Sequence, residues 1–426
     1  MVQGWFRPLV ALFAASSLAG CQQLGSVFPC DGYDSAYQSR LVAGGELLPE
    51  LSNSTVSYPM ALVLSQTAVN NLFARLANTA VPTLSDDATL LGQTLEVSVR
   101  PSLPLLAVGG DSRCPSCISA SLPFSVGLAI NGASANFGSG RLAAQLPIGI
   151  EPNADRSSAL LARFEDSDIL QIDLTVGDPE FDAYLDVVEP IAAALVTQYT
   201  RTRFASAKVA TFGSWRIGEG AVELAARGPI VRPESRTIVL AMQSNLPTAS
   251  GLAPTLPGAL PEGADLGVVV RLELLEALAK RIGSEEALGS AQVAGSGATD
   301  EGLGVTLESL QGASGGGVRT AAKLWKTDSF CGSADISAAL SLSFDPNGVQ
   351  FGVRDVAVTS GQGSGLLLTG SQALAASYMD RLAATLAIGA NYREVVGGEA
   401  GATPAVETFR ADLDAEGVSV YLSLLD

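Results

Sequence analysis

Apolar residues recur along this chain with two spacings that predict two kinds of element. Residues 65–77 place Val69, Leu72, Phe73 and Leu76 at helical spacing, directly after a short apolar stretch. Residues 118–130 alternate strictly between large apolar side chains and small, mostly polar ones, which is typical of a strand with one buried face and one solvated face. The mixture predicts an α+β fold with antiparallel sheets.

The strand-then-helix pattern occurs twice. The strand at Met60–Leu64 precedes the first helix, and Val268–Val270 precedes a second helical pattern that extends to residue 283. A shift of 268 − 62 = 206 positions aligns the two segments without a gap, from Leu62 with Val268 to Leu76 with Ile282. The chain therefore consists of two similar halves.

Each half continues with further strands and closes with a long helix and final strands. We expect one long helix from about Asp178 to Phe204, kinked at Pro190, and another over about 369–388. The alternation predicts strands at 94–100, 141–150, 168–176, 214–226, 236–246, 318–326, 336–344, 352–359, 408–413 and 418–425.

The N-terminus predicts export and a lipid anchor. Arg7 is followed by an apolar run from Leu9 to Leu18, and Leu18-Ala19-Gly20 precedes Cys21, as in a secretory signal peptide. This ending resembles the lipobox of bacterial lipoproteins, which implies that Cys21 is acylated and becomes the first mature residue. Gln22 in place of aspartate implies sorting to the outer membrane, facing the periplasm or the surface. The alternative is an ordinary signal peptide with a chance cysteine.

These patterns divide the chain into five parts. We predict a signal peptide at 1–20, a tether at 21–57, a first module at 58–246, a proline-rich linker at 247–266 and a second module at 267–426. The linker is marked by four prolines within twenty residues, which predicts a semi-extended segment.

Composition removes several classes of function. Hydrophobic residues make up 47% and charged residues 16%, which excludes a wholly disordered chain. The formal net charge of −18 argues against a nucleic-acid partner. Histidine is absent, which removes Ser-His-Asp catalysis and histidine-ligated metals. We expect no catalytic residue, no metal and no cofactor, although carboxylate chemistry stays open.

Four cysteines remain after Cys21 in a chain predicted to be exported, which favours two disulfides. Three pairings of Cys30, Cys114, Cys117 and Cys331 are possible. We favour Cys114–Cys117 with Cys30–Cys331, because this pairing closes a local ring and ties the N-terminal segment to the second half. A redox role for the CxxC motif is disfavoured, because a strand pattern rather than a helix follows it.

The repeated order of short strand, helix, antiparallel strands, long helix and closing strands resembles the tubular lipid-binding (TULIP) superfamily, the bactericidal/permeability-increasing protein-like fold. The resemblance implies two TULIP-like modules, each an antiparallel twisted sheet wrapped around a long helix. It further implies an apolar tunnel that binds or transfers acyl-chain lipids, with phospholipid or fatty acid as cargo and no catalysis.

Lining residues follow from the predicted faces of strands and helices. In the first module they are Phe73, Leu122, Phe124, Leu128, Leu185, Val188 and Leu195. In the second module they are Leu278, Leu340, Leu342, Phe344, Leu374, Tyr378 and Leu382. The alternative is a structural, assembly or protein-interaction lipoprotein of the outer membrane, whose apolar faces fill one another and leave no room for cargo.

Overall fold

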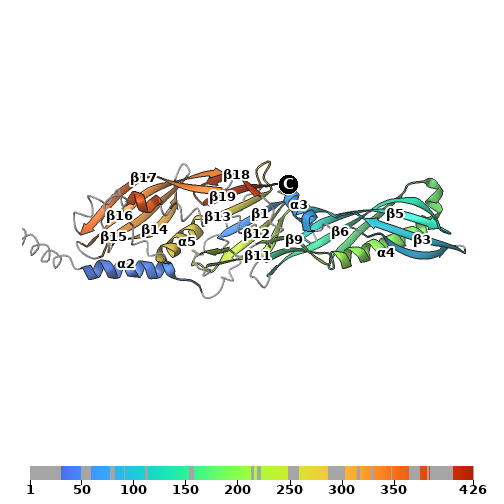
Figure 1. Cartoon of the computed structure of the whole chain (residues 1–426), viewed down its shortest axis with the longest axis horizontal. Helices are drawn as coiled ribbons and strands as arrows, with labels where there is room; N and C mark the ends of the chain where they lie inside the picture. Colours follow the sequence, from blue (N-terminus) through green and yellow to red (C-terminus); the bar gives the residue numbers. More distant parts are fainter. Residues whose placement is uncertain are drawn as a thin grey trace, which may run out of the picture.

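A computed structural model gives the arrangement of helices and strands shown in Figure 1. The structure describes residues 30–48, 59–76, 82–90, 92–110, 114–152, 158–212, 215–217, 222–247, 259–285, 303–313, 317–327, 331–346, 348–363, 375–380, 383 and 406–425.

The strands of these residues form three antiparallel sheets that follow one another along an elongated molecule (Figure 1). The middle sheet has the strand order β10-β11-β12-β1-β13-β19-β18 and takes strands from both halves of the chain. Its strands are β1 (Met60–Ser65), β10 (Trp215–Ile217), β11 (Val222–Arg232), β12 (Thr237–Ser244), β13 (Leu266–Arg271), β18 (Val406–Leu413) and β19 (Gly417–Leu424). The closing strands of the two halves therefore join one shared sheet.

Strands β1 and β13 lie side by side at the centre of this sheet. Leu62 lies directly opposite Val268, and these two residues are equivalent in the sequence repeat. Each strand leads directly into a helix, β1 into α3 (Gln66–Leu76) and β13 into α5 (Leu272–Glu285). An antiparallel pair in which equivalent residues face each other has a local twofold axis at that point. The sequence repeat thus corresponds to a local twofold relation at the middle of the molecule.

The sheet of the first half contains the longest described strand, β6. Its order is β2-β3-β5-β6-β7-β9, with β4 paired to β5 and β8 paired to β6. The bounds are β2 (Leu84–Leu90), β3 (Gln93–Pro101), β4 (Leu105–Val108), β5 (Cys117–Ile130), β6 (Ala133–Pro152), β7 (Ser158–Arg163), β8 (Asp168–Val176) and β9 (Ser206–Phe212). The Phe124 ring lies over Gly140 of β6, where a Cβ atom would overlap it, so the glycine makes room for the ring.

The helix predicted from Asp178 to Phe204 is two consecutive elements. A 3₁₀ helix, η1 (Pro179–Tyr184), precedes α4 (Leu185–Arg203). The Asp178 side chain accepts a hydrogen bond from the Glu180 N–H at 3.0 Å and caps η1. Helix α4 contacts β2, β3 and β8, so it covers one face of the first-half sheet (Figure 1). Pro190 lies inside α4.

The sheet of the second half has the order β14-β15-β16-β17. The bounds are β14 (Leu303–Gly312), β15 (Val318–Lys326), β16 (Gly332–Asp345) and β17 (Gly348–Gly363). Helix α5 is fixed to β14 through Glu276, whose carboxylate accepts the Leu310 N–H at 2.9 Å and an N–H of Lys280 at 2.6 Å. Residues 375–380 are helical and fall within the range predicted for the second long helix.

Helix α2 (Cys30–Gly45) lies along the second half (Figure 1) and was not predicted. It falls in the segment 21–57, for which the sequence predicted only a tether. Its buried residue is Tyr37, and the helix has no apolar face that periodicity could detect. Cys30 is joined to Cys331 and Cys114 to Cys117, which confirms the favoured pairing; the Cα atoms are 5.3 Å apart in each bond.

One apolar core extends through both halves, from Leu95 and Leu128 in the first to Ile336 and Leu340 in the second. The α+β class is confirmed. The described helices include none that is long and apolar enough to cross a membrane.

Candidate functional site

The predicted lining residues of the first-half sheet all point into the apolar core. Leu122, Phe124 and Leu128 alternate along β5 and are at most 3% exposed. Val188 of α4 is fully buried on the facing helix. Strand β5 and helix α4 therefore bring these four residues into one apolar interior, as the period-two and helical spacings predicted.

The buried stripe of α4 differs from the predicted one. Its buried apolar residues are Val188, Ala192, Val196 and Tyr199, whereas the predicted Leu185 and Leu195 are only partly buried at the edge of this face. The apolar arc of α4 is wide, and neighbouring apolar residues allow more than one stripe to be drawn through it. Three of the four buried residues, Val188, Ala192 and Val196, have smaller side chains than leucine.

Four aromatic rings meet where α3, β7 and the end of α4 converge. The Phe164 and Phe204 ring centroids are 5.3 Å apart, and Phe73 lies 5.9 Å from Phe204 and 6.2 Å from Phe164. Tyr199 contacts Phe204 edge-on at 5.7 Å. Such offset and edge-to-face pairs are favourable beyond simple burial. Of these rings, the sequence predicted Phe73 as a lining residue and Tyr199 as part of the apolar stripe of the helix.

A cavity of about 330 Å³ opens beside this aromatic cluster. It is lined by Phe73, Arg203, Phe204, Ala205, Ser206, Ala207 and Lys208. Ligand pockets of about 300–1,000 Å³ typically have apolar walls and a few placed polar groups. This cavity lies at the lower end of that range and combines an aromatic wall with two basic side chains. We refer to it below as the α4-end cavity.

A β-bulge lies directly behind the α4-end cavity. The register of β9 against β7 shifts between Ala210 and Lys208, so Val209 is the extra residue, and both Val209 and Ala210 are buried. The bulge leaves Lys208 exposed on the cavity side. Below it, the Ser206 hydroxyl donates to the Glu165 carboxylate at 2.8 Å, which fixes the start of the strand.

The second-half lining residues are less uniform. Leu278, Leu340 and Tyr378 are buried and Leu342 is partly buried, but Phe344 is 45% exposed. Its predicted place in the interior is therefore wrong. The in-out alternation of β16 ends at Leu340, since Leu342 is only partly buried and Phe344 is exposed. Leu374 and Leu382 lie outside the described residues.

A smaller cavity of about 180 Å³ lies between α2, α5 and β14. Its lining includes Leu41, Ala279, Leu307 and Tyr378, with Arg40 and Lys280 as its basic groups. Both cations already have carboxylate partners, Glu308 and Glu276 respectively. Burial raises the pKa of the Tyr378 hydroxyl, and the nearby Tyr37 adds to the rise. At about 180 Å³ this cavity is smaller than typical ligand pockets, so it is the weaker candidate for a lipid.

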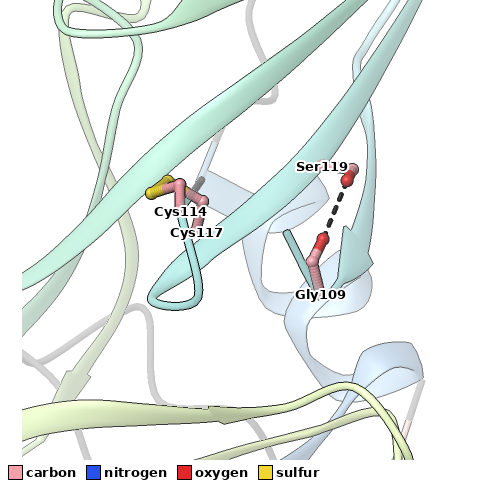
Figure 2. Close-up of a disulfide and its surroundings, with 4 residues drawn as sticks. All are labelled: Gly109, Cys114, Cys117 and Ser119. Atoms are coloured by element: carbon pink, nitrogen blue, oxygen red, sulfur yellow. Dashed lines mark hydrogen bonds between the residues drawn. A yellow bond between two sulfur atoms is a disulfide. The ribbon is translucent and has the colours of Figure 1, made fainter. Parts of the chain in front are cut away.

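The CxxC disulfide lies in the loop before β5 (Figure 2). Cys117 is the first residue of the strand, and its N–H donates to the Cys114 carbonyl at 3.1 Å. Beside it the Ser119 hydroxyl donates to the Gly109 carbonyl at 2.8 Å (Figure 2). The motif opens a strand, so the helix N-terminus that lowers a redox cysteine's pKa does not follow it. This geometry suits a structural loop closure.

The α4-end cavity contains residues whose role the sequence pattern did not show. Arg203 and Lys208 belong to a chain with only 25 basic residues, and they flank an aromatic residue within six positions. That spacing was visible in the sequence. However, basic residues at the C-terminal end of a helix are expected from the helix dipole alone, so they do not by themselves indicate a binding site. Among the described residues no group of three metal-binding side chains occurs.

No family model matches this chain, and no curated protein matches it. Among solved structures it is similar to P47 of Clostridium botulinum E1, with a TM-score of 0.45 and 10% identity over 87% of this chain and 100% of the other. It is also similar to a lipopolysaccharide binding protein, with a TM-score of 0.40 and 11% identity over 87% and 99%. At these values the likeness assigns the chain neither a family nor a ligand.

Proposed function

We propose that this protein binds acyl-chain lipids, phospholipid or fatty acid, and holds the acyl chain in its apolar interior. The observation that carries the proposal is the α4-end cavity, where an aromatic wall lies beside Arg203 and Lys208. Each buried methylene contributes about 0.8 kcal/mol, so an acyl chain against Phe73 and Phe204 supplies the driving force. The two cations suit a carboxylate or phosphate headgroup.

The proposal also covers where the protein is located in the cell and what kind of activity it has. Cys21 is acylated and holds the protein in the outer membrane, facing the periplasm or the surface, as Leu18-Ala19-Gly20-Cys21 implies. The protein acts by binding and not by catalysis, since a chain without histidine lacks the usual general base.

Replacing Cys21 by serine is expected to release the protein from membranes; retention in the membrane fraction would rule out the anchor.

The cavity is tested by a charge reversal and a blocking substitution. Lys208→Glu is expected to weaken binding of a fluorescent fatty acid about tenfold, because an attraction becomes a repulsion at the cavity rim. Arg319→Glu is the matched control, since Arg319 is exposed on β15 of the other half. Ala205→Trp fills the cavity and is expected to abolish uptake. Unchanged uptake in both Lys208→Glu and Ala205→Trp would exclude this cavity.

One observation favours the alternative of a closed structural lipoprotein. The predicted lining residues Leu122, Phe124 and Val188 pack into a continuous core, as expected if apolar faces fill one another. Phe124→Asp separates the two readings, with Phe344→Asp as a matched control at an exposed phenylalanine. Loss of folding in Phe124→Asp, together with no lipid uptake by the wild type, would favour the closed form. A folded variant that no longer takes up lipid would favour a tube open to solvent.

A further inference from the structure

The first residue of α2 is fixed at the outer end of the second half. Cys331, its disulfide partner, directly precedes β16, where β15 and β17 both end: Gly332 pairs with Lys326 and with Gly363. The other end of this sheet meets the middle sheet, where the Thr408 N–H donates to the Pro346 carbonyl at 3.3 Å. Figure 1 shows α2 beginning at the outer end and extending inward. Cys30 therefore lies at one tip of the molecule.

The disulfide fixes this end of α2 more firmly than its other contacts. The helix buries Tyr37 alone, whose ring lies 6.3 Å from Trp325 and directly over Gly304. An ion pair joins Arg40 of α2 to Glu308. The last residue of the helix, Gly45, accepts a hydrogen bond from Arg281 through its carbonyl. These contacts hold the middle and the end of α2. The covalent bond joins its start to Cys331.

The position of Cys30 limits how far the tip can lie from a lipid attached at Cys21. The two residues are 30 − 21 = 9 positions apart, and a fully extended chain spans at most about 3.6 Å per residue, or about 30 Å in total. Without the disulfide, the next contact of α2 given above is that of the buried Tyr37, 37 − 21 = 16 positions from Cys21. The limit would then be about 60 Å, or about twice as long.

The opposite tip of the molecule is formed by the turns of the first half. The β2–β3 turn ends at Gln93, and the β5–β6 turn contains Asn131, whose N–H donates to the Thr94 carbonyl at 3.1 Å. These turns lie at the end of the molecule farthest from α2 (Figure 1). The net charge of −18 repels the body from anionic lipid, which favours a body that stands away from the bilayer over one that lies flat on it.

We propose that the Cys30–Cys331 disulfide holds the tip of the second half at the bilayer and directs the first half away from it. The proposal rests on the acylation of Cys21 proposed above. It makes the turns around Gln93 and Asn131 the outward end of the protein. The first half, which contains the α4-end cavity, then extends from the middle sheet away from the membrane to that outward end.

Energy transfer from the protein to the bilayer tests this orientation. The full-length acylated protein is inserted into vesicles of phosphatidylethanolamine and phosphatidylglycerol that carry a rhodamine-labelled lipid. A donor dye is attached through a non-natural amino acid at Gln362, beside Cys331, or at Gln93, at the opposite tip; both are exposed. The proposal predicts transfer about threefold higher, or more, from Gln362, because the tip is held within about 30 Å. Equal transfer from the two sites would overturn it.

Disulfide variants show whether the covalent bond sets the orientation. Cys30→Ser with Cys331→Ser is expected to reduce the difference between the two sites, since the tether lengthens. Cys114→Ser with Cys117→Ser, the matched control, is expected to leave the difference unchanged. An unchanged difference in the first variant would overturn the role of the bond, and if that variant does not fold, the comparison of Gln362 with Gln93 in the wild type still decides the orientation. Vesicle binding that persists in Cys21→Ser would instead contradict the anchor.

Discussion

Two buried threonines in the second half differ in what their hydroxyl groups contact. The Thr306 hydroxyl accepts the Trp325 indole N–H at 2.9 Å. The Thr320 hydroxyl, buried on β15, has no hydrogen-bond partner among the described residues. A buried hydroxyl without a partner costs about 1–3 kcal/mol, whereas a satisfied one contributes about 1 kcal/mol. The same substitution at the two sites should therefore have opposite effects.

Thr320→Val is expected to raise the free energy of unfolding by about 1 kcal/mol, because it removes an unpaired buried hydroxyl at nearly constant volume. Thr306→Val is expected to lower it by about 1–3 kcal/mol, because the Trp325 N–H then loses its acceptor. Urea unfolding followed by tryptophan fluorescence measures both changes. A shift of both variants in the same direction would contradict the assigned contacts.

Tyr378 predicts how stability responds to alkaline pH. Burial raises its pKa above the ordinary value of 10.0, so the folded state binds this proton more tightly than the unfolded state does. The contribution of this proton to the free energy of unfolding is fully present below pH 10.0 and is lost as the pH rises above that value. Burial, together with Asp34, also raises the pKa of Tyr37.

We therefore expect the urea midpoint to stay level up to about pH 10 and to fall above it. In Tyr378→Phe the fall should be shallower, because one ionising group has been removed. The same loss of stability in this variant and in the wild type would show that Tyr378 does not control the alkaline limit.

At the scale of elements, the two disulfides close loops of very different length. Cys30 and Cys331 are 301 positions apart, and Cys114 and Cys117 are 3 apart. In the chain-entropy account a bond stabilises by restricting the unfolded chain, and the effect grows with loop length. The long loop corresponds to about 6 kcal/mol and the short one to about 2 kcal/mol.

Removing the Cys30–Cys331 bond should thus lower the melting temperature more than removing the Cys114–Cys117 bond. Each pair is replaced by serine, and differential scanning calorimetry compares the two variants with the wild type. A larger loss in the Cys114→Ser/Cys117→Ser variant would contradict this order and would indicate that the short loop is held mainly by native contacts.

Strong periodicity predicted most of the elements, and weak periodicity concealed the rest. The patterns at 168–176 and 318–326 match β8 and β15 residue for residue. Helix α2 was not predicted, because a helix held by a disulfide and polar contacts needs no apolar stripe. Phe344 was misplaced because the sequence alternation continues to residue 344, whereas the alternation of burial stops at Leu340. The aromatic cluster was not predicted, because its rings come from segments that are distant in the sequence and meet only in the folded protein.

At the scale of the whole molecule, the two halves share both a sheet and a core. β1 pairs with β13 across the middle, and the apolar core is continuous from the first half to the second. Unfolding one half would remove either β1 or β13 from the middle sheet and leave the other strand without its neighbour. The halves should therefore unfold together and not as separate units.

Calorimetry of the oxidised protein is expected to show a single transition whose calorimetric and van't Hoff enthalpies agree. Phe124→Asp, in the first half, should lower the temperature of that single transition. Two separate transitions, with only one of them shifted by Phe124→Asp, would show that the middle sheet does not couple the halves.

Native mass spectrometry of the soluble form that starts after Cys21, purified from a bacterial host under mild conditions, tests the central claim most directly. Lipid binding predicts an added mass that disappears on denaturation and is identified as phospholipid or fatty acid. Ala205→Trp, which fills the α4-end cavity, should reduce that added mass. A bare protein mass, followed by no uptake of a fluorescent fatty acid, would contradict lipid binding and favour a closed structural lipoprotein.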